Sequence, residues 1–103
     1  MDIMRHLECF LAVGEELHFG RAAERLGMEQ PPLSRRIRRL EEELGAELFD
    51  RGGRRTSLTA AGHVLMREAP ELLRQYRKLR TLVQRAESDG ERPDPPRPWS
   101  EIY

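Results

Sequence analysis

The sequence feature that most limits how this chain can fold is a regular apolar stripe in its second half. Seven positions follow one another at spacings of four, three, four, three, four and three residues: Leu65, Ala69, Leu72, Tyr76, Leu79, Val83 and Ala86. This spacing puts the side chains on one side of a helix that packs against another helix. A chain of 103 residues leaves little to cover so long a stripe. We therefore expect a long helix that pairs with a second copy of the chain through these residues.

The bounds of this long helix follow from its two ends. Thr59 is a good N-cap, and the helical pattern then continues to about Ser88. Pro70 lies inside the pattern, where it removes a backbone hydrogen bond at a cost of about 3 kcal/mol in an isolated helix. The sequence therefore predicts a kink or a helix joint at Pro70.

Three shorter helices are predicted before the long one. The first covers Ile3–Leu17, where apolar residues recur at spacings of three and four. The second follows a break at residues 18–20, contains Ala22, Ala23 and Leu26, and ends at Gly27, which tolerates the positive φ of a helix C-terminus. The turn after this helix is expected near residues 27–28.

The third helix is expected to begin near Gln30. Pro31 and Pro32 are tolerated there, because the first helical turn has backbone N–H groups without helical partners. One stripe is predicted to be buried, consisting of Leu33, Ile37, Leu40 and Leu44, and Gly45 ends the helix. After it, two short extended runs at 47–51 and 54–58 flank the pair Gly52–Gly53, which predicts a tight hairpin.

Charge is distributed unevenly along a chain whose formal net charge is zero. The third helix carries Arg35, Arg36, Arg38 and Arg39 without an acid, and Glu41, Glu42, Glu43 and Glu47 follow directly. The four arginines can therefore form a basic face on a neutral protein, although Arg36 and Arg39 are equally compatible with pairing to Glu42 and Glu43.

The second and third helices have the features of a helix-turn-helix. Ala23 permits close crossing, Gly27 forms the turn, and Gln30, Ser34 and Arg38 give the third helix a polar face opposite its buried stripe. The fold class that follows is mainly α, a winged helix-turn-helix with the hairpin as its wing and the long helix behind it. We expect a DNA-binding domain at 1–58, a dimerisation helix at 59–88 and a flexible Pro-rich tail at 89–103.

Four motifs in this order resemble the LysR family of bacterial transcriptional regulators. They are Phe19–Leu26 (FGRAAERL), Gln30–Glu41 (QPPLSRRIRRLE), Leu48–Arg51 (LFDR) and Leu58–Gly62 (LTAAG). The resemblance covers nearly all of residues 1–88. It implies a third helix in the major groove, a wing on the backbone or minor groove, and an antiparallel contact between long helices. The implied partner is an interrupted palindromic promoter site bound by a dimer.

The resemblance also implies roles for single residues. Gln30, Pro32 and Arg35 are expected against base edges, Ser34 and Arg51 on phosphates, and Arg38 in either role. The remaining DNA-binding candidates are Arg54 and Arg55 in the wing and Thr59, whose structural role as a cap is favoured. Separately, Gln and Arg can make paired hydrogen bonds to purine edges.

This sequence departs from the family pattern at four points. Glu29 stands where a Ser or Thr usually caps the recognition helix, and its charge is expected to weaken or retune DNA binding. The second departure is Pro32, which has no N–H for a cap to bind, so less capping energy is lost than usual. Gly20 stands in place of the usual hydroxyl cap of the second helix. Finally, a Pro-rich stretch stands where family members continue into a ligand-sensing domain. Two interpretations fit this difference: the sequence is an excised piece of a longer protein, or it is a stand-alone binding domain.

Other classes of protein fit the sequence less well. No apolar run is long enough for a membrane span, and the single cysteine, Cys9, agrees with a cytoplasmic protein. His6 and Cys9 lack the further ligands that a metal site needs, and the histidines are too scattered to form a catalytic site. We therefore expect no enzyme activity and infer no cofactor or small-molecule ligand. One alternative is a pairing protein that binds another regulator through its long helix and has little DNA affinity. The tail residues Trp99 and Tyr103 are either part of a flexible end or a docking motif.

Overall fold

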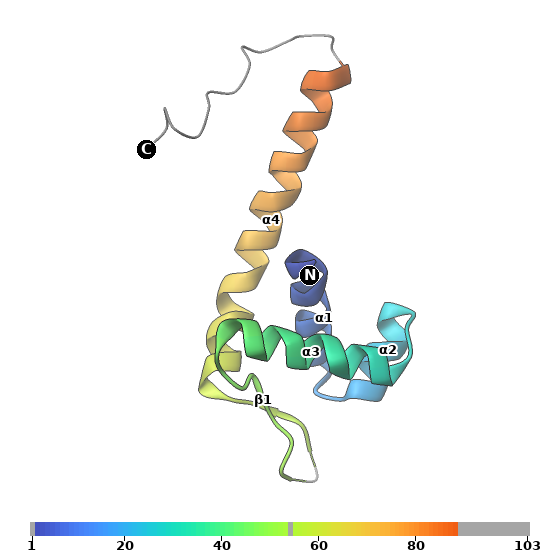
Figure 1. Cartoon of the computed structure of the whole chain (residues 1–103), viewed down its shortest axis with the longest axis vertical. Helices are drawn as coiled ribbons and strands as arrows, with labels where there is room; N and C mark the ends of the chain where they lie inside the picture. Colours follow the sequence, from blue (N-terminus) through green and yellow to red (C-terminus); the bar gives the residue numbers. More distant parts are fainter. Residues whose placement is uncertain (1, 54, 89–103) are drawn as a thin grey trace. The chain divides into compact units, whose positions relative to one another are not determined.

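The computed structural model describes residues 2–53 and 55–88. Their elements, in chain order, are α1 (Ile3–Glu16), α2 (Phe19–Leu26), α3 (Gln30–Leu44), β1 (Phe49–Asp50), β2 (Ser57–Leu58) and α4 (Ala60–Ser88) (Figure 1). This mainly helical architecture with one small sheet confirms the predicted fold class. The chain divides into two compact units, Met1–Leu73 and Arg74–Tyr103. The tail from residue 89, with Trp99 and Tyr103, lies outside the described residues.

The core of the first unit lies where α1, α2 and α3 meet the base of the hairpin. Its fully buried side chains include Phe10, Val13, Leu33, Ile37, Leu40, Leu48 and Phe49. The Phe49 ring lies 5.3 Å from that of Phe10 and 5.8 Å from that of Phe19, measured between centroids. Each such aromatic side chain stabilises the fold by roughly 1.5–3 kcal/mol through burial, so β1 is held firmly against α1 and α2.

The helix ends agree with the sequence for α1 and α3 and differ for the start of α2. The C-caps of α2 and α3 are Gly27 and Gly45, with φ of 66° and 71°. The break expected at residues 18–20 is shorter, because Phe19 and Gly20 already belong to α2. His18 is the N-cap, and its Nδ1 accepts a hydrogen bond from the N–H of Arg21 at 2.9 Å. The expectation that Gly20 is the cap was therefore wrong.

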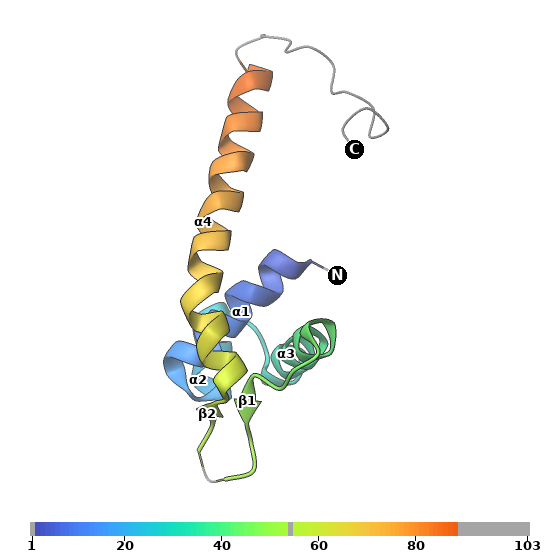
Figure 2. The same cartoon turned by 90° about the vertical axis from the view of Figure 1, so that its left-hand side faces the viewer.

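The hairpin is looser than predicted. In Figure 2 β1 and β2 form the only strands of the described part, paired antiparallel with Phe49 opposite Leu58 and Asp50 opposite Ser57. Residues 51–56 connect them, so the loop is longer than the two-residue Gly–Gly turn that was expected. Neither Gly52 nor Gly53 has a positive φ, and the Asp50 carboxylate accepts the Gly52 N–H at 2.9 Å. The loop thus turns with local side-chain support.

Leu44 differs from the other members of the predicted α3 stripe. Leu33, Ile37 and Leu40 are completely buried, whereas Leu44 is 48% exposed. It occupies the last position of α3, immediately before Gly45 turns the chain. The buried stripe therefore ends at Leu40.

The first half of α4 is anchored to the base of the hairpin. Thr59 caps it as predicted, since its Oγ1 accepts the N–H of Gly62 at 3.0 Å. Gly62 packs so closely on the carbonyl of Leu48 that a Cβ there would collide with it. Ala69 and Leu73 are buried in the core, and Leu65 packs against it. The assignment of Ala69 to a seam between subunits was therefore wrong, because its own domain covers it, whereas Leu65 is of intermediate exposure and stays a predicted seam residue.

Pro70 lies within α4, which is a single helix from Ala60 to Ser88, so the alternative of a helix joint was wrong.

The rest of the predicted seam is accessible. Leu72 is 47% exposed in the first unit, and Tyr76, Leu79 and Val83 are 42%, 59% and 61% exposed in the second. Ala86 is of intermediate exposure. Within the described residues, no helix has the length and apolar character needed to cross a membrane.

Candidate nucleic-acid interface

Helix α3 separates a buried stripe from a polar surface. Gln30, Arg35 and Arg38 are exposed, whereas Leu33, Ile37 and Leu40 are inaccessible to solvent. A rotation of about 100° per residue places Arg35 and Arg38 opposite the buried stripe, whereas Gln30 is exposed because it is the first residue of α3. The predicted base-reading residues therefore lie on a surface that the core does not use.

Several of the predicted residues line a common hollow between α3 and the wing. Gln30, Ser34, Arg38 and Arg51 surround a space of about 240 Å³ together with Phe19, Gly53 and Thr56. A neighbouring hollow of about 800 Å³ brings Arg55 and Gln30 beside the start of α2. These two hollows join the recognition surface of α3 to the wing. Arg54 lies outside the described residues.

Pro32 and Arg35 face a different hollow, on the flank of α3 next to α1. This α1–α3 hollow, of about 410 Å³, is lined by Asp2, Arg5, His6, Pro32, Arg35, Arg36 and Arg39. The structure therefore divides the predicted DNA-binding residues between two flanks of one helix.

Arg51 is held between the recognition helix and the core. Its Nη2 lies 3.1 Å from Glu41 Oε1, and its guanidinium carbon lies 5.4 Å from the centroid of the Phe19 ring. With 36% of its side chain exposed, Arg51 keeps donors available to a phosphate. The ion pair and the cation–π contact restrict the side chain, which lowers the entropy that a phosphate contact would cost.

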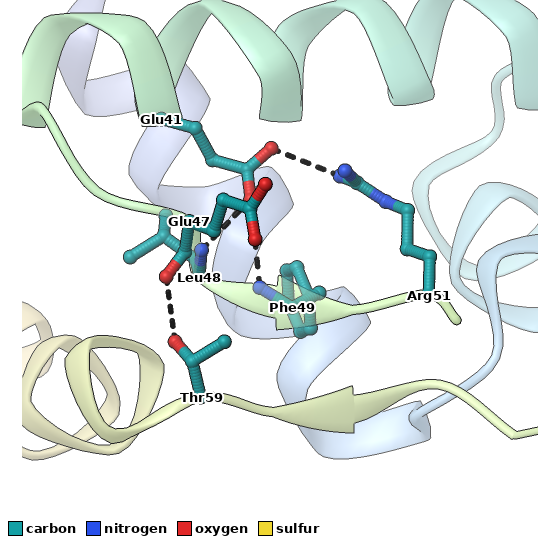
Figure 3. Close-up of polar contacts among 6 residues, drawn as sticks. All are labelled: Glu41, Glu47, Leu48, Phe49, Arg51 and Thr59. Carbon is teal, nitrogen blue, oxygen red and sulfur yellow. Dashed lines mark hydrogen bonds and ion pairs between the residues drawn. The ribbon is translucent and has the colours of Figure 1, made fainter. Parts of the chain in front are cut away.

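Glu41 connects α3 to the wing (Figure 3). Its Oε2 accepts the backbone N–H of Leu48 at 2.7 Å and lies 3.5 Å from that of Phe49, while Oε1 pairs with Arg51. The residue is only 9% exposed, so its charge depends on these donors. The carboxylate thus fixes the position of β1 relative to the helix that carries the base-reading candidates.

Thr59 uses its hydroxyl within the fold. The hydroxyl donates to the carbonyl of Glu47 at 2.6 Å (Figure 3). It also accepts from the N–H of Gly62. These two bonds support the structural role that the sequence favoured.

The charges of α3 are not neutralised by its acidic neighbours. Among residues 2–53 and 55–88, no carboxylate forms an ion pair with any of its four arginines. The pairing of Arg36 and Arg39 with Glu42 and Glu43 is therefore not found. Arg25 of α2, by contrast, pairs with Glu15 at 2.8 Å, and this hydrogen bond raises the pKa of its guanidinium. Exposed unpaired guanidinium groups give α3 a positive surface.

Sequence reasoning missed three residues of this site. Glu41 was counted only among the acids that follow the four arginines, although its position four residues after Ile37, beside the buried stripe, was a signal that it reaches the core. His18 was not considered as a cap because imidazole rarely has that role. Phe19 was placed in a break, so its contacts with Phe49 and Arg51 were not foreseen.

Three helices, a β-hairpin wing and a polar recognition surface on α3 define a winged helix-turn-helix protein. The family model described as "Bacterial regulatory helix-turn-helix protein, lysR family" matches residues 4–63. This chain belongs to the LysR family. It is 50% identical over 82 residues to the HTH-type transcriptional regulator AlsR of Bacillus subtilis, which covers 80% of this chain and 27% of AlsR. The chain spans about a quarter of the length of such curated relatives.

Solved structures of the family agree with the fold. The crystal structure of the BenM_DBD/catB site 1 DNA complex is 44% identical, with a TM-score of 0.73 over 82% of this chain and 94% of that one. The CbnR_DBD–DNA complex is 36% identical, with a TM-score of 0.75 over 82% of this chain and 97% of that one. Both similar proteins were crystallised with DNA, and the relatives are transcriptional regulators rather than enzymes.

Proposed function

We propose that this chain binds double-stranded DNA sequence-specifically and regulates transcription from the promoter where it is bound. The observation that carries the proposal is the exposed, unpaired positive surface of α3, which stands on a rigid buried stripe beside a wing tied to the same helix. A helix of this width fits the major groove of B-DNA. Similar chains were crystallised in complex with DNA, which supports DNA binding by this chain. The cytoplasm is the compartment proposed for it.

The proposed readers are Gln30 and Arg35, with Arg38 available to bases or phosphates. Their exposed amide and guanidinium groups can each make paired hydrogen bonds to a purine, worth about 1–3 kcal/mol of discrimination per base pair. Pro32 adds an apolar contact beside Arg35. Ser34, Arg51, Arg55 and Arg54 are proposed to contact the backbone, where contacts position the protein without reading sequence.

The active form is proposed to be a homodimer that places two α3 helices on an interrupted, roughly palindromic site. The exposed Leu72, Tyr76, Leu79 and Val83 support this part, because solvent-facing apolar residues at heptad spacing are stabilised by a partner helix. Sedimentation of the wild type is expected to give twice the monomer mass, and Leu72→Arg is expected to give a monomer. A monomeric wild type would contradict the dimer.

The test of DNA binding is a titration of a fluorescent fragment from beside the gene of this protein, at two salt concentrations. Specific binding that weakens steeply with salt and is lost in Arg35→Ala is the expected result. Arg67→Ala, a change of the same side chain on α4, is the matched control and should bind like the wild type. A folded dimer without salt-sensitive binding would instead support the pairing-protein alternative.

A further inference from the structure

We propose that the α1–α3 hollow binds a backbone phosphate of DNA, on the side of the recognition helix opposite the wing. This inference rests on the proposed function and adds a binding site to it. A phosphate is the ligand class that a hollow lined by four arginines favours, because arginine donates paired, charge-assisted hydrogen bonds to phosphate oxygens.

The geometry of α3 places this hollow on the second flank of the helix. Successive residues rotate by about 100°, so Arg36 and Arg39 lie close together and face away from Ser34 and Arg38. The wing-side hollow contains Ser34, Arg38 and Arg51, whereas the α1–α3 hollow contains Arg5, Arg36 and Arg39. No residue lines both hollows, although residues of α3 line each of them.

A helix in the major groove lies between two phosphate backbones. The groove is about 12 Å wide and a helix with its side chains is about 10–12 Å in diameter, so each flank of the helix comes near one strand. The wing-side flank accounts for one backbone. The α1–α3 hollow is the basic surface available to the other.

The charges in this hollow favour an anion. Arg35, Arg36 and Arg39 form no ion pair within residues 2–53 and 55–88. Arg5 shares its guanidinium with Glu8 at 3.3 Å, and the Asp2 carboxylate accepts the backbone N–H of Arg5 at 3.2 Å. Both acids therefore have donors of their own, and the arginines of α3 remain available for a phosphate.

His6 forms part of the wall and is not needed as a donor. Its Nδ1 lies 2.7 Å from the carbonyl oxygen of Asp2, which can only accept, so Nδ1 carries the hydrogen. Its Nε2 is buried without a hydrogen-bond partner in the described part of the chain. The arginines, which carry several donors and no acceptor, are the groups proposed to bind a phosphodiester.

The experiment compares the salt dependence of DNA binding in Arg36→Gln, Arg39→Gln and the double variant. The log–log slope is expected to fall by about 0.9 for each phosphate that the variant no longer neutralises, and affinity should drop by the same factor on the target and on unrelated DNA. Arg67→Gln on α4 is the matched control with an unchanged slope. Arg39 is exposed, so Arg39→Gln preserves the test even where Arg36→Gln, at a half-buried position, impairs folding.

Each outcome separates this inference from the proposed function. Wild type that binds no DNA refutes the proposed function and the inference with it. Wild type that binds, with slopes unchanged in Arg39→Gln and the double variant, overturns the inference alone. Calorimetry with inorganic phosphate and no DNA is the second arm: phosphate binding that Arg39→Gln abolishes, combined with an unchanged DNA slope, would assign the hollow to a free phosphate and refute its role on the DNA backbone.

Discussion

Replacement of Glu41 by alanine should destabilise the domain far more than replacement of an exposed acid. Its carboxylate accepts the buried N–H of Leu48 at 2.7 Å, and loss of that acceptor costs about 1–3 kcal/mol. The partly exposed ion pair with Arg51 adds roughly 0.2–1 kcal/mol, while the 3.5 Å approach to Phe49 adds little. We expect a total loss of about 1–4 kcal/mol in the free energy of unfolding.

Two further variants separate the contributions of Glu41. Glu41→Gln keeps an oxygen for the N–H of Leu48 and loses the charge opposite Arg51, so its cost should be about 1 kcal/mol. Glu42→Ala, at an exposed neighbouring position, is the control and should lie within about 0.5 kcal/mol of the wild type.

Urea unfolding followed by circular dichroism measures these differences, and thermal melts give a second reading. For a domain of this size 1 kcal/mol corresponds to a shift in Tm of about 4–8 °C, so Glu41→Ala should melt at least roughly 4 °C below the wild type. Equal stability of Glu41→Ala and Glu42→Ala would refute the reasoning. So would a glutamine variant as unstable as the alanine variant, since the backbone hydrogen bond would then not be the main contribution.

Two other substitutions test the packing and the electrostatics of the same unit. Gly62→Ala should lower the free energy of unfolding in urea by at least about 2 kcal/mol, because the new Cβ would collide with the carbonyl of Leu48. Gly53→Ala is the control and should cost much less, since a Cβ there meets nothing within 4 Å. Similar melting of the two variants would contradict the close packing of Gly62 on Leu48. Glu29→Ser should leave stability unchanged, because prolines occupy the α3 positions whose N–H groups a cap would bind, and should raise DNA affinity and steepen its salt dependence by removing a negative charge. Unchanged affinity and slope in Glu29→Ser would show that Glu29 does not affect the bound phosphates.

Local signals were sufficient to predict most of the helices. Gly27 and Gly45 end α2 and α3 with positive φ, and Pro31 and Pro32 mark the first turn of α3, so these bounds depend on residues close in sequence. The start of α2 was missed because a histidine caps it. The exposure of Leu44 could not be read from its spacing, since the pattern shows which side a residue faces but not where the core ends.

The sequence predicted which residue types form the candidate site, but not the residues that hold them in position. Arg35 and Arg38 have the exposure expected of them because the stripe opposite them is apolar, and Gln30 has it because it is the first residue of α3. Glu41 was missed because its partners Leu48 and Arg51 are seven and ten residues away, and only the fold brings them together. The burial of the α4 stripe could not be predicted for the same reason. Its spacing alone does not distinguish Ala69, which its own domain covers, from Leu79, which is exposed.

The division of α3 into a buried stripe and an exposed surface has a consequence for how this family can diversify. Leu33, Ile37 and Leu40 carry the folding energy of the helix, whereas Gln30, Arg35 and Arg38 contribute little to it. Mutations at the exposed positions can therefore accumulate in duplicated genes without unfolding the product. With the DNA-reading roles proposed above for these positions, new operator preferences can arise by single substitutions on an unchanged scaffold, and two descendants can diverge in their target promoters while keeping the same core.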